Sequence, residues 1–361
     1  MLIGIDASRA AAGQPTGTES YSLQLIRALL EVESTHQLRL YLNRPGNDLF
    51  PRAANAELRH IPFPRLWTHA RLAAELASHR VDLLLVPSHV LPVFFPGRAV
   101  AVVHDLGYLR FPQAHRMVDR WYLNLSTRWN TRRAAVIIAD SEATRRDLVL
   151  HCGARPDRIE VVYPGIDTNL RPVRDRARLD EVRTRYGIQA DYMLYLGTLQ
   201  PRKNLARLLD AYAQLDPEAV QLVLAGKPGW LSGPILSRAQ EVGAVLPGYI
   251  RDQDKAALLS GAVAFLFPSL YEGFGFPVLE AMACGTPVIC SNTSSLPEVA
   301  GQAALQVDPL DTTALMEAMR RILSDKPLAE TLVQSGFVNL ERFSWHSCAR
   351  QVLELCERAA E

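Results

Sequence analysis

The sequence predicts an α/β protein made of two doubly wound parallel sheets with a cleft between them. Short apolar, β-branched runs alternate with longer amphipathic segments, which is typical of a parallel sheet covered on both faces. This alternation pauses between residues 160 and 180 and then starts again. A chain of 361 residues also exceeds the usual size of one domain. We therefore expect two domains.

The elements of the first half follow in order. LIGID at 2–6 predicts a buried strand, and 20–32 predicts a helix because its apolar residues recur at helical spacing. Further strands are predicted at 38–42, 82–86, 99–104 and 135–139, and further helices at 67–79, 118–132 and 142–150.

The second half repeats the pattern after a segment at 160–180 that mixes proline, glycine and charge and predicts a connection. The strands predicted there are 192–197, 220–226, 263–269 and 286–291. The first domain is placed at 1–170 and the second at 185–344. The helical run at 345–361 comes after the second sheet is complete.

Composition excludes several classes of protein. A net charge of +1 gives no reason to expect nucleic acid as a partner. The five cysteines are scattered without a CxxC, which indicates reduced thiols of a cytoplasmic protein rather than disulfides or a zinc site. The segment MLIGIDASRA has no basic leader, and no uncharged apolar run reaches about 18 residues. We expect neither a signal peptide nor a spanning helix.

Ligands of open parallel sheets bind beyond the carboxyl ends of the strands, so the loops there are the candidate sites. Gly13 and Gly17 make a flexible loop that leads into a helix N-terminus, a favourable place for an anion. Arg202 and Lys203 precede another helix, with Asn204 as a candidate cap. Two cations there suit a diphosphate. A mobile loop and a solvated basic turn remain the alternatives.

The stretch YEGFGFPVLEAMACG at 271–285 places two carboxylates on either side of a strand-to-helix junction. Glu272 lies in the loop, and Glu280 lies on a helix that Pro277 begins and Gly285 ends. A carboxylate accepts hydrogen bonds from adjacent sugar hydroxyls, and the loop N–H groups can meet a phosphate. The alternative is structural, with one glutamate capping the helix and the other on its outer face.

These motifs resemble the retaining GT-B glycosyltransferases of family 4. The family's Glu-x7-Glu motif is present as Glu272 and Glu280, LGTLQPRKN matches its phosphate-binding region, and VVHDL places His104 where the family has a histidine. The resemblance covers nearly the whole chain and is strongest from 190 to 310. It implies two Rossmann-like domains facing each other across a cleft, with the helix at 345–361 crossing back to the first.

The resemblance implies a role for each matching residue. Glu280 would bind the ribose, and Glu272 would contact the donor hexose near its reacting end. Arg202 and Lys203 would neutralise the diphosphate leaving group, and His104 would line the catalytic face. Other donor contacts would come from the glycine loop of Gly13 and Gly17, from Gly197, from Gly273, Phe274 and Gly275, and, for the base, from Gly248, Tyr249 and Ile250.

The implied reaction moves a hexose with retention, by a front-face displacement, and without a metal or another cofactor. GDP-mannose is the favoured donor, because SLYEGFGFPVLEAMACGTPV resembles bacterial mannosyl- and rhamnosyltransferases of cell-surface polysaccharide assembly. UDP- and dTDP-sugars are alternatives. The acceptor would be a glycan or a lipid-linked sugar. A nucleotide-sugar epimerase and a non-catalytic binding protein also remain open, whereas a nicotinamide oxidoreductase lacks its GxGxxG loop.

Three weaker patterns have alternatives. Asp252-Gln-Asp254 is interpreted as helix capping rather than a metal motif. The segment 115–135, rich in arginine and aromatic residues, is expected to be a solvated helix with a buried aromatic face; peripheral contact with an anionic membrane is the alternative. The apolar loop at 87–97 would line the acceptor site or touch lipid.

Overall fold

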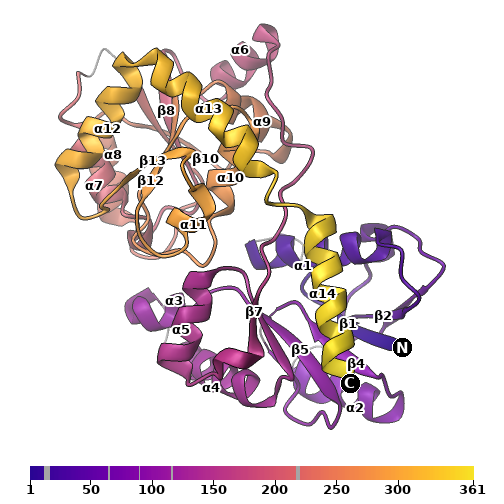
Figure 1. Ribbon diagram of the computed structural model, residues 1–361. Coiled ribbons are helices and arrows are strands. Elements are labelled where there is room, and N and C mark those ends of the chain that lie inside the picture. The colour runs from indigo at the N-terminus through magenta and orange to yellow at the C-terminus, as the bar shows by residue number, and fades with distance from the viewer. Residues whose placement is uncertain (12–16, 64–65, 89, 115–116, 217–219) are drawn as a thin grey trace. The chain divides into compact units, whose positions relative to one another are not determined.

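The computed structural model describes the chain except residues 12–16, 64–65, 89, 115–116 and 217–219 (Figure 1). It divides into two compact units. Unit 1 holds Met1–Gly165 and Phe343–Glu361, and unit 2 holds Ile166–Arg342. The sequence predicts the domain boundary between residues 170 and 185, whereas in the structure the chain passes from unit 1 to unit 2 after Gly165.

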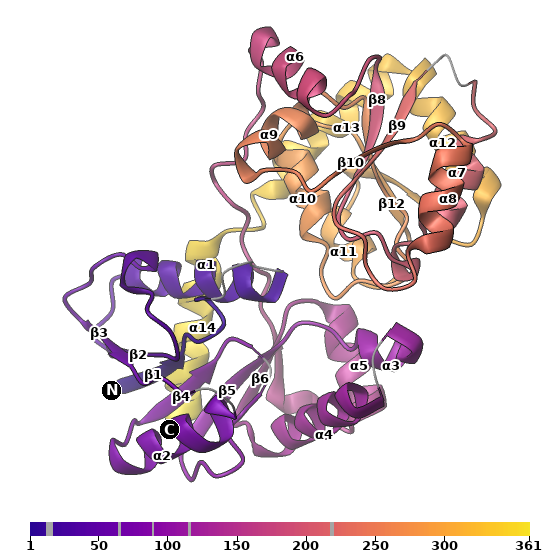
Figure 2. The ribbon, with the colours of Figure 1, turned by 180° about the vertical axis from the view of Figure 1, so that it is seen from behind.

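Unit 1 is built on a seven-stranded parallel sheet of order β3-β2-β1-β4-β5-β6-β7 (Figure 2). Its strands are β1 (Leu2–Asp6), β2 (Gln37–Leu42), β3 (Ala56–His60), β4 (Leu83–Val86), β5 (Arg98–Val103), β6 (Val136–Ala139) and β7 (Ile159–Val161). Its helices are α1 (Gly17–Glu31), α2 (Ala73–Ser78), α3 (Gly107–Arg110), α4 (Met117–Arg133), α5 (Glu142–Cys152) and α14 (Trp345–Ala360). Short turns are η1 (Asn47–Leu49), the π-helical η2 (Trp67–Leu72), η3 (Pro112–Ala114) and η4 (Pro156–Arg158).

Unit 2 is built on a six-stranded parallel sheet of order β10-β9-β8-β11-β12-β13. Its strands are β8 (Tyr192–Leu196), β9 (Gln221–Ala225), β10 (Val245–Gly248), β11 (Ala264–Phe267), β12 (Val288–Ser291) and β13 (Ala304–Val307). Its helices are α6 (Arg176–Arg185), η5 (Pro201–Lys203), α7 (Leu205–Tyr212), α8 (Gly233–Glu241), α9 (Asp252–Ser260), α10 (Phe276–Ala283), α11 (Leu296–Ala300), α12 (Thr312–Ser324) and α13 (Lys326–Leu340).

The predicted class, two doubly wound Rossmann-like sheets, is confirmed. Strands β3, β7, β10 and β13 were not predicted, and all four lie at an edge of their sheet. An edge strand is covered by only one neighbour, so its residues stay partly exposed and need not form a continuous apolar run. β3 (AELRH) contains no fully buried residue. The segment 160–180 is also not a bare connection, because it contains the end of β7 and the start of α6.

Each sheet has one point at which the chain reverses its direction of winding. In unit 1 this point lies between β1 and β4, and in unit 2 it lies between β8 and β11. The loops that follow two such strands turn to opposite faces and leave a crevice at the carboxyl edge. The loops after β8 and β11 are the ones that carry Arg202, Lys203 and Glu272.

The C-terminal helix α14 belongs to unit 1, where it packs against α1 and strands β4 and β5 (Figure 1). Ser344 caps its N-terminus, and the apolar face that includes Val352 and Cys356 is buried. At the other end Arg98 donates a hydrogen bond to the carbonyl of Ala359 at 3.1 Å. No helix in the described residues is long and apolar enough to cross a membrane.

Asp254 is the centre of a polar cluster that fixes α6 to α9 within unit 2. Its carboxylate is fully buried and accepts from Arg178 at 2.5 Å, from Arg185 at 2.8 Å and from the hydroxyl of Tyr186 at 2.7 Å. The sequence assigned this aspartate to helix capping. Because its partners come from a distant helix, only the folded chain reveals them.

Asp254→Ala should therefore lower the free energy of unfolding by about 2 kcal/mol, since it removes the buried acceptor of Tyr186 and of two arginines that keep Glu181 as a partner. Asp252→Ala is the matched control, because Asp252 lies on the same helix and is exposed. It should cost less than about 0.5 kcal/mol. Urea denaturation of both variants measures the difference, and equal losses would contradict a structural role for the cluster.

Candidate active site

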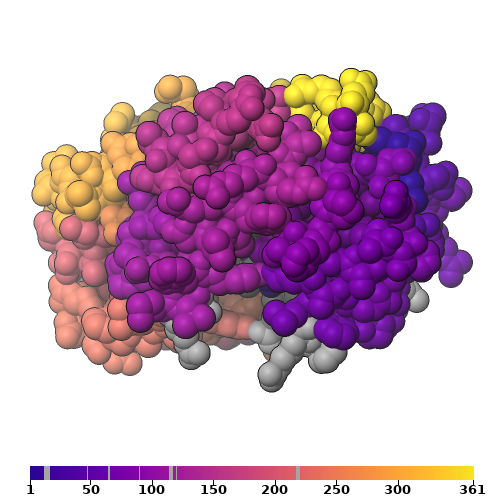
Figure 3. Space-filling model, turned by 90° about the horizontal axis from the view of Figure 1, so that it is seen from below, coloured from indigo at the N-terminus to yellow at the C-terminus, as the bar shows by residue number. Residues whose placement is uncertain are grey.

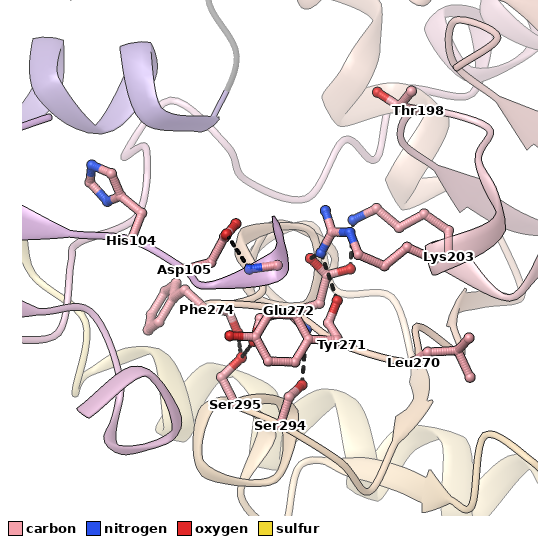
Figure 4. Close-up of polar contacts among 12 residues, drawn as sticks. His104, Asp105, Thr198, Lys203, Leu270, Tyr271, Glu272, Phe274, Ser294 and Ser295 are labelled. Carbon is pink, nitrogen blue, oxygen red and sulfur yellow. Dashed lines mark hydrogen bonds and ion pairs between the residues drawn. The ribbon is translucent and has the colours of Figure 1, made fainter. Parts of the chain in front are cut away.

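Lys203 and Glu272 form a buried ion pair at the switch point of the unit 2 sheet (Figure 4). Lys203 ends η5 after β8, and Glu272 lies in the loop after the neighbouring strand β11. Lys203 Nζ donates to Glu272 Oε1 at 2.5 Å. The ammonium also lies 4.9 Å from the ring centroid of Phe267, a cation–π distance. Two loops that are 69 residues apart in sequence thus meet at one charge pair.

Arg202 reinforces this junction from the same turn. Its Nη1 donates to Glu272 Oε2 at 3.1 Å and to the carbonyl of Tyr271 at 2.6 Å, while its own carbonyl accepts from the N–H of Leu270 at 3.0 Å. Burial alone would raise the pKa of Glu272, but the charges of Lys203 and Arg202 outweigh burial and lower it. The carboxylate is therefore ionised at neutral pH.

Asn204 has a different role from the predicted one. It adopts a left-handed conformation with φ of 60°, and its side chain makes no helix-capping hydrogen bond. The amide instead donates to the carbonyls of Pro268 at 3.1 Å and Pro309 at 2.6 Å. It joins the turn after β8 to the segments that follow β11 and β13.

Two serines that the sequence analysis did not select hold the loop of Glu272 in place. Ser294 Oγ accepts from the N–H of Glu272 at 3.0 Å. Ser295 Oγ contacts the carbonyls of Glu272 at 3.0 Å and Phe274 at 2.6 Å (Figure 4). Both follow β12, so the rule that ligands bind beyond strand ends could have drawn attention to them. Backbone contacts of this kind have no sequence spacing of their own.

Gly275 marks the junction between this loop and α10. Its φ is 120°, and a Cβ there would lie 2.7 Å from Leu296 Cδ2. Only glycine fits that conformation and that space. One turn into α10, Glu280 Oε1 accepts from Lys255 Nζ of α9 at 2.5 Å. The predicted role of Glu280 was to bind a ribose, and the prediction did not include a contact with Lys255.

The other residues of unit 2 that were predicted to contact the donor lie at the ends of neighbouring strands. Gly197 directly follows β8, and Gly226 directly follows β9. The two glycines approach each other so closely that a Cβ on Gly226 would lie 1.9 Å from the carbonyl oxygen of Gly197. Gly248 ends β10 and is followed by Tyr249, which is 58% exposed, and by the buried Ile250. Lys227 Nζ lies 4.8 Å from the centroid of the Tyr249 ring.

His104 lies in unit 1, after β5, and its ring is enclosed there. Nδ1 is 2.6 Å from Asp140 Oδ2, and Nε2 is 2.8 Å from the carbonyl of Pro87. The Pro87 carbonyl and an ionised Asp140 both accept, so this geometry favours an imidazolium whose two ring nitrogens both donate. Burial lowers the pKa of His104, but Asp140 and Pro87 outweigh it and hold the pKa above its ordinary value. Tyr21 of α1 meets the ring edge-on at 4.6 Å between centroids.

Two further predictions concern the glycine loop and metals. Gly17 is the first residue of α1, whereas Gly13 lies outside the described residues. Within the part of the chain that the structure describes, no group of three histidine, cysteine or acidic residues could hold a metal ion. The five cysteines are free and buried.

Comparison with known proteins identifies the family. The family model of glycosyl transferases group 1 matches residues 181–337, and that of Glycosyltransferase Family 4 matches residues 15–170. The O-antigen chain mannosyltransferase B of Escherichia coli is 31% identical over 94% of this chain and 95% of its own length. The chain belongs to glycosyltransferase family 4. The resemblance drawn from the Glu-x7-Glu motif is thus confirmed.

Other family 4 relatives and solved structures agree in class. The MMP alpha-(1->4)-mannosyltransferase of Mycolicibacterium hassiacum is 32% identical over 67% of this chain and 59% of its own length. Sucrose-phosphate synthase from Thermosynechococcus elongatus has a TM-score of 0.78 at 22% identity, covering 99% of this chain and 98% of its own. WaaG, a glycosyltransferase involved in lipopolysaccharide biosynthesis, has a TM-score of 0.70 at 18% identity, covering 99% of each chain. The fold is GT-B, and the protein is a glycosyltransferase.

The family 4 residues thus fall into two groups. In unit 2 the structure brings Arg202, Lys203 and Glu272 into direct contact, and Glu280 lies on the helix that follows. His104 is held separately within unit 1 by Asp140, which the sequence analysis did not select. The signal for Asp140 was available, because it directly follows the strand beside that of His104.

Proposed function

We propose that this glycosyltransferase moves a hexose from a nucleotide sugar to a glycan or lipid-linked acceptor, with retention of anomeric configuration and without a metal. The observation that carries the proposal is the cluster of Arg202 and Lys203 around Glu272 at the switch point of unit 2. It supplies two cations for a diphosphate and one ionised carboxylate for sugar hydroxyls. Cations held in this way stabilise the negative charge that develops on a diphosphate leaving group.

The proposed chemistry uses this cluster as follows. As the bond between C1 of the hexose and the phosphate oxygen breaks, negative charge grows on the diphosphate. Lys203 and Arg202, already held in place by Glu272, stabilise that charge without reorganising. The acceptor oxygen forms its bond to C1 on the same face, and its proton passes to the leaving phosphate oxygen. No protein nucleophile takes part.

Mannose from GDP-mannose is the proposed donor, supported by relatives that are named as mannosyltransferases over most of this chain. The O-antigen name of one of them supports a role in cell-surface polysaccharide assembly. UDP- and dTDP-sugars are the second candidates. The proposed location is the cytoplasm, with peripheral contact at the inner face of the plasma membrane.

A thermal-shift panel with GDP, UDP, dTDP, ADP and NAD, with and without chelator, tests the donor. A nucleotide at about 100 times its Kd should add about 2.7 kcal/mol to the stability. We expect the GDP shift to be the largest and to survive chelator. A larger shift with UDP than with GDP would indicate a UDP-sugar as the donor. A shift with NAD alone would contradict the proposed transfer. The anomeric signal of the product by NMR then tests retention, and epimerised nucleotide sugar formed without acceptor would indicate an epimerase.

A further inference from the structure

The first strand of unit 1 ends on a buried carboxyl group. Asp6 is the last residue of β1 and the only charged one in LIGID, and it is 3% exposed. Its Oδ1 accepts from the N–H of Ser8 at 3.0 Å and from the hydroxyl of Ser8 at 2.6 Å. The other oxygen, Oδ2, accepts no hydrogen bond within the described residues and is not enclosed by the protein. One oxygen of Asp6 thus holds the loop that follows, and the other is available to a ligand.

Asp6 also has no ion-pair partner within the part of the chain that the structure describes. Arg9, on the same loop, pairs with Glu19 of α1 at 3.5 Å instead. Burial is the main influence on the carboxyl group and raises the pKa of Asp6, while the Ser8 bonds and the charge of Arg9 lower it by less. Burying a carboxyl group without a counter-ion destabilises a fold, so its presence at this place indicates a use beyond the fold.

The position of Asp6 is the switch point of the unit 1 sheet. β1 and β4 are neighbours there, and the chain winds away from them in opposite directions. β5, which precedes His104, lies on the far side of β4. Neighbouring strands are about 4.8 Å apart, so the ends of β1 and β5 are about 10 Å apart, a span that one or two sugar units can bridge. Open parallel sheets bind their ligands at such a point.

The aromatic residues of α4 border the same loop. Burial raises the pKa of Tyr122, and the charge of Arg9 offsets part of this rise, which places α4 beside the loop after β1. Tyr122 and Trp121 are 48% and 72% exposed, whereas Trp129 packs against the core. The expected solvated helix with a buried aromatic face is therefore wrong for Trp121 and Tyr122. Aromatic rings beside a few polar groups are the usual lining of a site for a small molecule.

We propose that Asp6 binds a hydroxyl group of the acceptor sugar, with Oδ2 accepting the hydrogen bond while Oδ1 keeps the loop in place. The hydroxyl gives the buried carboxyl group the hydrogen bond that water gives to an exposed one. The inference rests on the proposed transfer of a hexose, and it adds a group of unit 1 that recognises the acceptor. Asp6 takes part in no covalent step.

Asp6→Asn tests the proposal, because asparagine has the same shape and keeps one oxygen for the two Ser8 bonds. The probes are the octyl glycosides of mannose, glucose and N-acetylglucosamine, used with GDP-mannose or with the nucleotide sugar that the thermal-shift panel selects. We expect kcat/KM for the acceptor to fall about 10- to 100-fold, the usual effect of losing one hydrogen bond to a charged group. The KM for the donor and the hydrolysis of the donor by water should be unchanged.

Asp82→Asn is the matched control. Asp82 lies at the opposite end of the same pair of strands, where its Oδ2 accepts from the N–H of Leu2 in β1 at 2.6 Å, and it is exposed. Figure 3 views unit 1 from that side, on which α14 ends (yellow) beside Arg98, the first residue of β5. This variant should transfer the hexose like the wild type.

Ser8→Ala separates the hold on the loop from the contact with the acceptor. It removes the hydroxyl that donates to Oδ1 and leaves Oδ2 as it is. It should lower the free energy of unfolding while changing kcat/KM for the acceptor much less than Asp6→Asn does. Equal losses of kcat/KM in the two variants would mean that Asp6 acts only through the loop, and would overturn the proposal.

Monodeoxy acceptors identify the hydroxyl. At one position of the best octyl glycoside, the deoxy compound should lose about as much kcat/KM with the wild type as Asp6→Asn loses with the parent compound. Combining the two changes should add little further loss, because both remove the same hydrogen bond. Full additivity at every position would overturn the proposal. Transfer to none of the three glycosides by a wild type that hydrolyses the donor would do the same, whereas absence of both reactions would contradict the proposed function itself and the inference with it.

Discussion

Lys203→Ala is expected to lower kcat/KM by about 100- to 1000-fold, the usual effect of removing one preorganised group that stabilises developing charge. The structure adds a second consequence. Lys203 is paired with Glu272 inside the protein, so the variant leaves a buried carboxylate that has lost one of its two described cationic partners and keeps Arg202. The free energy of unfolding should fall by about 3 kcal/mol. Steady-state kinetics and urea denaturation measure the two effects.

The double variant Lys203→Ala/Glu272→Gln separates these effects. A neutral glutamine no longer needs the ammonium, so most of the lost stability should return while activity stays low. Lys326→Ala is the control, because Lys326 is an exposed lysine at the start of α13 in the same unit. Recovery of turnover in the double variant would mean that Lys203 acts only by neutralising Glu272.

Asp140→Asn should lower the free energy of unfolding by about 3 kcal/mol, because it removes the carboxylate that pairs with the buried His104. The second carboxylate oxygen, Oδ1, is buried and makes no hydrogen bond within the described residues. In the variant, the amide nitrogen of the asparagine would take the place of one of the two oxygens. At the Oδ1 position it would have no acceptor, and at the Oδ2 position it would face the N–H of His104.

In this variant the contribution of His104 to the free energy of unfolding should change with pH in the opposite direction. In the wild type the pKa of His104 is raised, so its contribution to stability is complete below the unfolded pKa of about 6.5 and is lost as pH rises through the folded pKa. Without Asp140 the largest remaining cause is burial, which lowers the pKa of His104, while the Pro87 carbonyl and Asp105 each raise it by less. The contribution would then be present above pH of about 6.5 and lost as pH falls.

Urea denaturation of wild type and Asp140→Asn between pH 5.5 and 8.5, an interval around the ordinary histidine pKa of about 6.5, provides the measurement. Burial raises the pKa of Tyr21 and Cys348, which lie beside this pair, so both stay neutral in that interval. Parallel pH profiles for the two proteins would contradict an imidazolium at His104. Turnover of His104→Ala, with nucleotide affinity unchanged, would then decide whether the residue also serves catalysis.

The central strands were predictable because both of their faces are buried. LIGID, AVAVV and VQLVLA must be continuous apolar runs if helices cover them on both sides, so the fold class followed from the sequence. The edge strands β3 and β10 were not predicted, because a partly exposed strand does not need a continuous apolar run. α4 was predicted as a helix, but its orientation was not, because its apolar side faces outward.

The sequence by itself determined the α/β class, the family and the local placement of Glu272 and Glu280 around the glycine loop, because these depend on residues close together in the chain. Only the tertiary structure decided which groups neutralise each other. The ion pair of Lys203 with Glu272, the pair of His104 with Asp140 and the cluster around Asp254 join residues between 36 and 76 positions apart. The order of strands in the sheet brings the first two pairs together, and helix packing brings the third. Neither the strand order nor the helix packing can be predicted from local sequence patterns, because both depend on contacts between distant parts of the chain.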